Sequence, residues 1–255
     1  MLWRVAFAFV VAVLLGAIPF VFATASELRA MASTVLFPED LSEKGACPNG
    51  YVALTFDDGP DPVTTPQVAQ ALRNGGARGT FFVVGAKAGA HPEVVQQIRT
   101  QGMEVANHTY DHPFLDELAP DRLRDEMIAT SKIIDRGGPA PDLFRAPYGR
   151  TNDMVRDTAS ALGMTEVLWT LDSNDYEHAT PDHMVEVAKR SKHGDVILFH
   201  DIFPSTVAAI PRILDNLRER GLCSGRIVPS GTPTQAWVDY GGSDRKYYSA
   251  TTARW

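Results

Sequence analysis

Cysteine is scarce in this sequence of 255 residues, which contains only Cys47 and Cys223. There is no C-x-x-C pair, and the two residues are far apart in the chain. The sequence therefore argues against a metal site built on thiolates and against a thiol nucleophile. Two interpretations of the pair stay open: a disulfide, which an exported protein would favour, and two buried free thiols.

Positive charge is also sparse, with 24 Lys and Arg residues against 31 Asp and Glu residues, for a net charge of −7. No basic stripe or Lys/Arg run occurs, which excludes the usual electrostatic footprint of a nucleic-acid-binding protein. Internal repeats and low-complexity blocks are absent too. A 44% hydrophobic content is ordinary for a globular protein, and this length allows one α/β barrel domain.

Only one long apolar run is present, at residues 5–22, between Arg4 and the small residues Ala23-Thr24-Ala25. This pattern is typical of a secretory signal peptide and predicts a secreted protein. The alternative is an uncleaved segment that anchors the protein in a membrane. The expected organisation is therefore a signal peptide at 1–25, a linker at 26–47, a folded domain at 48–228 and a tail at 229–255.

Strand-like and helix-like segments alternate through the expected domain. Short apolar runs bounded by turn residues indicate buried strands, and apolar residues three and four apart indicate helices. The expected strands are residues 51–56, 80–84, 103–106, 143–146, 165–171, 196–199 and 226–228. Such alternation requires parallel strands with right-handed crossovers, in either an α/β barrel or a doubly wound sheet.

Chemically reactive side chains follow five of these strands. They are Asp57 and Asp58, His108 and His112, Arg145, Asp172 and Asp175, and His200 and Asp201. In an α/β barrel the carboxyl ends of the strands converge on one face, where active sites are built. This placement favours a barrel that carries a site.

Two histidines and one carboxylate form a candidate metal site. His108 and His112 are four residues apart, so both imidazoles can turn toward one point, and the pair Asp57-Asp58 can add a carboxylate. A set of two histidines and one carboxylate suits Zn²⁺, Fe²⁺ or Co²⁺ and leaves positions open for water or substrate. Each pattern alone is weak, since D-D-G-P can be a mere turn.

The second carboxylate of the pair also predicts a chemical role. Successive residues at a strand end point in different directions, so one carboxylate can bind the metal while the other faces the substrate. A metal that activates water, a carboxylate base and a histidine acid are the minimum equipment for hydrolysing an ester or an amide. Two-metal phosphoesterase chemistry is less well supported, because it needs more bridging ligands than this sequence offers.

At this point the sequence resembles the polysaccharide deacetylases of carbohydrate esterase family 4, also called the NodB homology domain, including secreted acetylxylan esterases and chitin deacetylases. The resemblance covers about residues 51–226 and rests on five motifs in the family's order. They are Thr55-Phe56-Asp57-Asp58-Gly59-Pro60, His108-Thr109-Tyr110-Asp111-His112, Arg145-Ala146-Pro147-Tyr148-Gly149, Asp172 with Asp175, and Leu198-Phe199-His200. The resemblance implies a single domain with a distorted, incomplete (β/α) barrel of about seven parallel strands.

The resemblance also implies a role for each site residue. Asp58, His108 and His112 would bind one divalent metal ion, zinc or alternatively cobalt. Asp57 would be the general base and Arg145 would orient it.

On the other side of the scissile bond, His200 would be the general acid and Asp172 would orient it. The backbone N–H of Tyr148 would stabilise the oxyanion, and Leu198 would line the pocket for the acetyl methyl group.

Two departures from the family's pattern concern the substrate. Tyr176 stands where the family commonly has tryptophan, which alters a wall of the substrate site, and Arg150 places a positive charge near its rim. The expected partner is an acetylated polysaccharide such as chitin oligomers, peptidoglycan or xylan, bound by a monomer, with ester and amide cleavage both open. No nucleic acid is expected, and no membrane partner unless the N-terminal segment is retained. A carbohydrate-binding protein on a deacetylase scaffold is the alternative function.

Overall fold

The computed structural model describes residues 47–138, 140–225 and 227, together with the backbone of residues 237–239 and 246–248. The expected signal peptide and all of the linker except its last residue lie outside these residues. Among the residues described, no helix combines the length and apolar character needed to cross a membrane.

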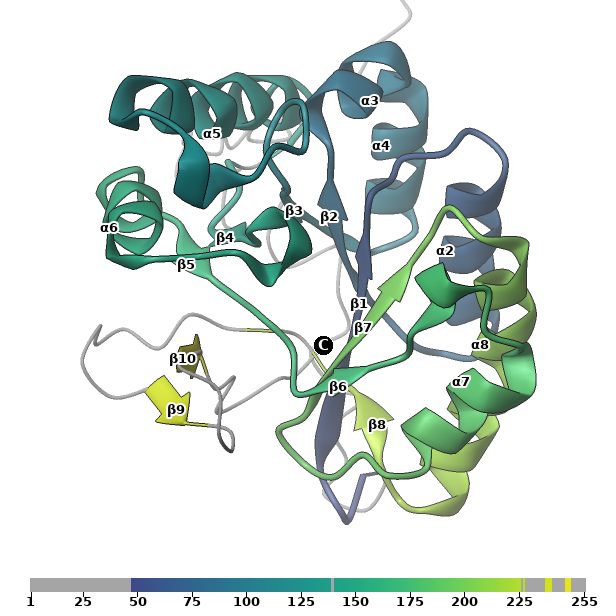
Figure 1. The fold of residues 1–255 in the computed structure, drawn as a ribbon. Coiled ribbons are helices and arrows are strands. Elements are labelled where there is room, and N and C mark those ends of the chain that lie inside the picture. The colour runs from purple at the N-terminus through teal and green to yellow at the C-terminus, as the bar shows by residue number, and fades with distance from the viewer. Residues whose placement is uncertain (1–46, 139, 226, 228–236, 240–245, 249–255) are drawn as a thin grey trace, which may run out of the picture. The chain divides into compact units, whose positions relative to one another are not determined.

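A parallel sheet organises the described domain (Figure 1). Its seven-strand path runs in the order β5-β4-β3-β2-β1-β7-β6, and β8 pairs with the beginning of β1. The strands are β1 (Tyr51–Asp57), β2 (Thr80–Val83), β3 (Glu104–Asn107), β4 (Leu143–Phe144), β5 (Thr165–Glu166), β6 (Leu171–Asp172), β7 (Val196–His200) and β8 (Cys223–Ser224). The expected incomplete (β/α) barrel is confirmed.

The barrel is incomplete between β5 and β6, which form the two ends of the seven-strand path. They are neighbours in the chain, joined only by residues 167–170. The single strand expected at residues 165–171 is therefore wrong. Its first part pairs with β4 and its last part with β7, and the segment between them crosses the gap. The strand expected at residues 226–228 lies outside the described residues, apart from residue 227; an eighth strand of this sheet, not expected from the sequence, is β8, which pairs with β1.

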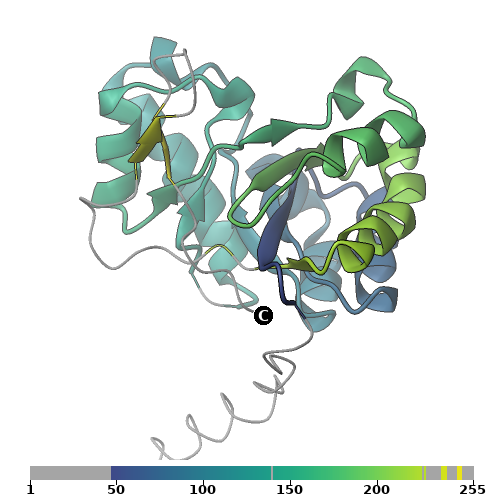
Figure 2. The same ribbon diagram turned by 90° about the horizontal axis from the view of Figure 1, so that it is seen from below.

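Helices cover the outer side of the sheet (Figures 1 and 2). They are α2 (Thr64–Asn74), α3 (Gly85–Ala90), α4 (Pro92–Thr100), α5 (Pro120–Asp135), α6 (Asp153–Ala161), α7 (Pro181–Ala188) and α8 (Pro204–Glu219), with 3₁₀ turns η1 (Leu115–Glu117), η2 (Pro147–Gly149) and η3 (Asp175–Glu177). Proline in the first turn starts several of them, because its fixed φ suits that position and its missing N–H costs nothing there. Helix α3 was not expected from the sequence.

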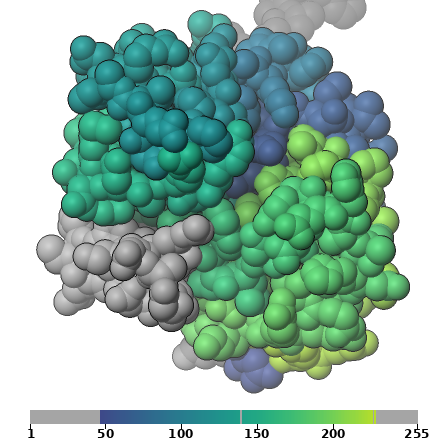
Figure 3. All heavy atoms as spheres, in the orientation of Figure 1, coloured from purple at the N-terminus to yellow at the C-terminus, as the bar shows by residue number. Residues whose placement is uncertain are grey.

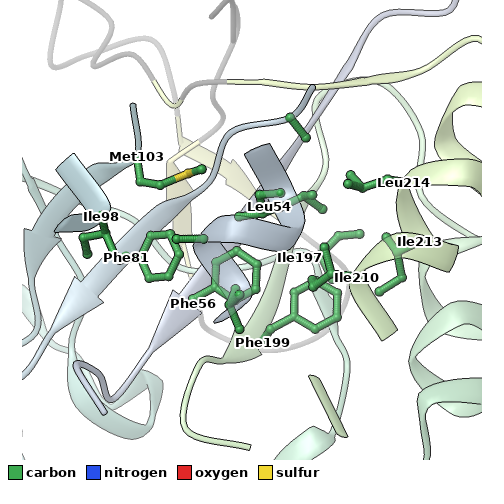
Figure 4. Close-up of a cluster of buried hydrophobic side chains, with 14 of the residues drawn as sticks. Leu54, Phe56, Phe81, Ile98, Met103, Ile197, Phe199, Ile210, Ile213 and Leu214 are labelled. Carbon is green, nitrogen blue, oxygen red and sulfur yellow. The ribbon is translucent and has the colours of Figure 1, made fainter. Parts of the chain in front are cut away.

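Alternation along β1 separates the core from the interior of the barrel. Leu54 and Phe56 point toward the helices, and Phe56 stacks on Phe81 and Phe199 with ring centroids 4.9 and 5.6 Å away. These rings belong to the large apolar cluster drawn in Figure 4. The alternate residues of β1 face the barrel interior, and Asp57 is the last of them. Packing on one face of the strand therefore fixes the direction of the reactive carboxylate on the other.

The two cysteines form a disulfide, Cys47–Cys223, with Cα atoms 5.6 Å apart. It joins the chain just before β1 to β8, and Cys223 lies opposite Tyr51 in the parallel register. The alternative of two free thiols is excluded. In the segment expected to be a tail, the structure describes one antiparallel pair, β9 (Trp237–Asp239) and β10 (Lys246–Tyr248).

Candidate active site

The carboxyl ends of the central strands bring the expected site residues together. Asp57 ends β1 and lies directly opposite His200, the last residue of β7. His108 follows β3 and Arg145 follows β4. In Figure 3 the dark-blue atoms of the chain near β1 are seen between the teal and the green atoms of the later segments. Parallel pairing thus gathers residues far apart in the sequence at one edge of the sheet.

Asp58, His108 and His112 form a group that could hold a metal ion, with one ligand atom of each within 4.8 Å of the others. The Asp58 Oδ1 atom lies 3.4 Å from His108 Nε2 and 3.0 Å from His112 Nε2. The two Nε2 atoms are 3.2 Å apart. Ligand atoms about 2.0–2.2 Å from a tetrahedral ion would themselves be roughly 3.3 Å apart, so the group has the spacing of a metal site.

Protonation and burial also fit a metal ion. His108 Nδ1 donates to the Arg145 carbonyl oxygen at 2.8 Å, so Nε2 is the ring nitrogen that faces the group. Asp58 Oδ1 is buried and, among the described residues, makes no hydrogen bond of acceptable geometry. Burial opposes ionisation of Asp58, but the two imidazoles outweigh it and hold the pKa of this carboxyl well below its usual value. A cation would satisfy the carboxylate oxygen and both nitrogens.

Asp57 is a buried carboxylate held by Arg145. The Arg145 Nη1 atom donates to Asp57 Oδ1 at 2.7 Å and to Thr55 Oγ1 at 2.9 Å. The other oxygen, Oδ2, lies 3.7 Å from His108 Nε2, on the side of the metal group. One oxygen is therefore fixed by the guanidinium, and the other faces the place where a water would be activated.

The gap in the barrel accommodates the Arg145 side chain, which is completely buried. Its Nε and Nη2 atoms donate to the carbonyl oxygens of Val167 and Leu168, at 2.9 and 3.2 Å. These carbonyls belong to the segment that crosses between β5 and β6. Burial lowers the pKa of Arg145, whereas the charge and hydrogen bond of Asp57 act in the opposite direction. The irregular backbone in the gap thus supplies hydrogen-bond acceptors for a buried cation.

Asp175, and not Asp172, orients His200, so the role expected for Asp172 is corrected. Asp175 Oδ1 is 2.7 Å from His200 Nδ1, and its Oδ2 accepts from the His200 backbone N–H and from Thr206 Oγ1, each at 2.7 Å. Burial alone would lower the pKa of His200. The Asp175 hydrogen bond and charge, with the charges of Asp57 and Asp58, instead raise it to about 9.

Asp172 lies beside this pair without a hydrogen bond to His200. Its Oδ1 accepts from the Asn174 backbone N–H at 2.8 Å, and its Oδ2 lies 3.3 Å from the Tyr176 hydroxyl. The Asn174 residue has a left-handed backbone, with φ of 53°, which turns the chain between the two carboxylates. This turn, rather than β6 itself, selects the carboxylate that reaches His200.

Tyr148, Leu198 and Tyr176 all lie at the same edge. Tyr148 has φ of 59° and is exposed, with its ring 4.6 Å from that of His112. Leu198 is buried on β7, and it shares a face with His200 because the two residues are two apart on a strand. The Tyr176 ring meets His200 edge-on at 5.5 Å.

Sequence reasoning missed several contacts of the site. Lys87 donates from Nζ to the Asp58 carbonyl oxygen at 2.8 Å. Asp201 is completely buried, and burial raises its pKa to about 7, although the Thr65 hydroxyl donates to it. No local pattern indicates these contacts, since each joins elements far apart in the chain.

The arrangement is suited to hydrolysis. A buried carboxylate and a histidine of raised pKa lie on either side of a candidate metal group, with His200 Nε2 3.9 Å from Asp58 Oδ2. The carboxylate can accept a proton from water, and the protonated histidine can donate one to a leaving group.

Comparison with known proteins gives the same indication. The family model described as polysaccharide deacetylase matches residues 44–167. A peptidoglycan-N-acetylglucosamine deacetylase of Bacillus cereus is 37% identical over 176 residues, covering 67% of this chain and 83% of that protein. A bifunctional xylanase/xylan deacetylase of Cellvibrio japonicus is 38% identical over 184 residues, covering 71% of this chain. The chain spans only 28% of the length of that second protein.

A solved structure is similar in fold and sequence. It is a family 4 carbohydrate esterase from Streptomyces lividans in complex with acetate, with 44% identity and a TM-score of 0.69. The match covers 71% of this chain and 94% of that one.

Proposed function

The chain belongs to the polysaccharide deacetylase family, carbohydrate esterase family 4, and from this premise we propose that it is a metal-dependent hydrolase that removes acetyl groups from a polysaccharide. The observation that carries the proposal is the grouping of Asp58, His108 and His112 between Asp57 and His200. A structural cluster of charges would not place a fixed base and a fixed acid on opposite sides of three metal-type ligands.

The residues of the chain divide the proton transfers between them. Asp57 takes the proton from the attacking water, and Arg145 holds Asp57 in place by a hydrogen bond. His200 gives a proton to the leaving oxygen or nitrogen, and Asp175 keeps it protonated and aligned. The Tyr148 backbone N–H, on a loop with a left-handed backbone, is directed at the developing oxyanion, and Leu198 contacts the acetyl methyl group.

A divalent metal ion held by Asp58, His108 and His112 would supply Lewis-acid chemistry, lowering the pKa of a water and polarising the acyl carbonyl. Zinc is the proposed ion, because two imidazoles and one carboxylate at this spacing match its tetrahedral preference, and cobalt is the alternative. We further propose that the protein is exported and monomeric. The Cys47–Cys223 disulfide supports export, since disulfides persist in oxidising compartments.

The substrates of the relatives suggest which acetylated polymers to test. Acetate release is measured from acetylated xylan, N-acetylglucosamine oligomers and peptidoglycan, before and after treatment with a chelator and after zinc is restored. The expected result is release that the chelator abolishes and zinc restores. His112→Ala should lose both acetate release and metal content, measured by elemental analysis.

A carbohydrate-binding protein on the same scaffold is the competing function. It predicts binding of the same oligosaccharides by calorimetry with no acetate released at any metal concentration. That outcome would reject the deacetylase proposal.

A further inference from the structure

Large apolar side chains are seldom exposed in the part of the chain that the structure describes, and the exceptions gather in the loops around the site. They are Val63, Tyr110, Phe114, Tyr148 and Tyr176. Four of the five are aromatic, and each aromatic follows a site residue by a few positions in the same loop. Because exposed aromatics are costly and here lie beside reactive groups, they point to contact with a ligand.

The rings of Phe114 and Tyr148 form a pair that lies next to the candidate metal group. Their ring centroids are 4.5 Å apart, and the Tyr148 ring meets His112 at 4.6 Å. Phe114 is 42% exposed and Tyr148 is 54% exposed, so both rings present apolar surface to solvent. We call this pair the two-ring platform.

Arg150 supports the two-ring platform, and we call its contacts with the platform and with two carboxylates the brace. Its guanidinium lies over the Phe114 ring at 4.4 Å from the centroid. Its Nε and Nη2 donate to Asp116 Oδ2 at 3.0 and 2.9 Å, and Nη2 donates to Glu117 Oε1 at 2.7 Å. The brace ties the loop after β3 to the loop after β4. The two rings, which come from separate loops, are therefore held in one relative orientation.

We propose that the two-ring platform is a subsite for an uncharged pyranose ring of the substrate, next to the acetylated sugar, with Phe114 a specificity-determining residue and Arg150 a positioning residue. This inference rests on the proposed deacetylase function and adds the chemistry of the neighbouring sugar. The C–H face of a pyranose is apolar and matches an aromatic surface, and the platform is continuous with the site through His112.

Charge decides against an acidic sugar at this subsite. The guanidinium of Arg150 is already engaged by two carboxylates, so the brace carries more negative than positive charge. A carboxylate on the sugar would therefore meet the like charges of Asp116 and Glu117, whose shared cation is already paired.

The test separates sugar binding from chemistry by the choice of substrate. Acetate release is measured from uncharged acetylated oligosaccharides of increasing length and from an aryl acetate, which has no neighbouring sugar. Phe114→Ala should raise KM for the longer oligosaccharides about 3- to 10-fold, with kcat nearly unchanged. Hydrolysis of the aryl acetate should stay within about 2-fold, and metal content should not change. Phe114→Tyr keeps a ring and should restore the wild-type KM.

Arg150→Gln tests the brace, with Arg218→Gln as a matched control whose arginine pairs with Asp215 on α8, outside the platform. Arg150→Gln should raise the same KM by a smaller factor, and should add little when Phe114 is already alanine. The control should leave KM unchanged.

Three outcomes would overturn the inference while acetate release by the wild type still supports the proposed function. In the first, Phe114→Ala leaves every oligosaccharide KM unchanged. In the second, it slows the aryl acetate as much as the oligosaccharides, which indicates damage to the site. In the third, the wild type prefers oligomers that carry lactyl carboxylates next to the reacting sugar. Absence of acetate release from every substrate would instead reject the proposed function itself.

Discussion

The two sides of the site to which we assign the proton transfers are built differently. On the base side, Asp57 is held by Arg145, and both are buried in the barrel, with hydrogen bonds to β1 and to the segment that crosses the gap. On the acid side, His200 is partly exposed and depends on Asp175, which comes from one turn after β6.

This contrast follows from what each group must do. A carboxylate base needs a fixed direction, which a rigid, dry network of strands supplies. A histidine acid must reach the leaving group and regain a proton from solvent, so partial exposure suits it. We therefore expect changes on the base side to affect both folding and turnover, and changes on the acid side to affect mainly turnover and its pH dependence.

Asp57→Asn gives the largest expected effect on rate. Loss of the base should reduce kcat about 10²- to 10⁴-fold, because general-base catalysis contributes about that much. Metal content should stay at the wild-type level, since Asp58 and both histidines remain. A fully active variant would show that another group takes the proton from water.

Arg145→Met should destabilise the fold by about 3–5 kcal/mol, because it leaves the Asp57 carboxylate buried without its cation. Urea unfolding at pH 7 measures the loss of free energy. Arg218→Met is the control, because its ion pair with Asp215 is largely exposed and should contribute less than about 1 kcal/mol. Equal losses in the two variants would contradict the special role of the base side.

Asp175→Asn should lower kcat about 10- to 100-fold and shift its pH profile. Against the effect of burial, the hydrogen bond and charge of Asp175, with the charges of Asp57 and Asp58, raise the pKa of His200 to about 9, and the acid must be protonated to act. Without the Asp175 charge His200 loses its proton at lower pH, so the basic limb of kcat should move toward neutral pH. A bound dication lowers the wild-type limb as well, so the comparison is between variant and wild type with the same metal. An unmoved limb would exclude His200 as the acid.

Asp172→Asn is the smallest expected change, at about 3-fold or less in kcat, because Asp172 makes no hydrogen bond to His200. Carried out beside Asp175→Asn, it tests which carboxylate aligns the acid. A larger loss in Asp172→Asn would restore the role first expected for it.

Much of this architecture could be predicted from the sequence, because it depends on local patterns. Apolar runs marked β1, β2 and β7 correctly, and the reactive residues at their ends predicted the edge where the site lies. The break between β5 and β6 could not be predicted, since residues 165–171 read as one apolar run and only pairing with different neighbours divides them. The choice between Asp172 and Asp175 depends on a turn at Asn174 and on Thr206 from α8, neither of which a local pattern indicates.

The residues with a left-handed backbone suggest how the sequence of such a site would change if its activity were lost. Among the described residues other than glycine, positive φ occurs at Asp58, Thr109, His112, Tyr148, Asn174 and His178, all in loops or 3₁₀ turns that follow the carboxyl ends of strands. Each costs of order 1 kcal/mol that glycine would release. A descendant of this chain freed from catalysis would gain stability by acquiring glycine at these positions. Glycine at Asp58 or His112 would therefore be a sequence mark of lost activity.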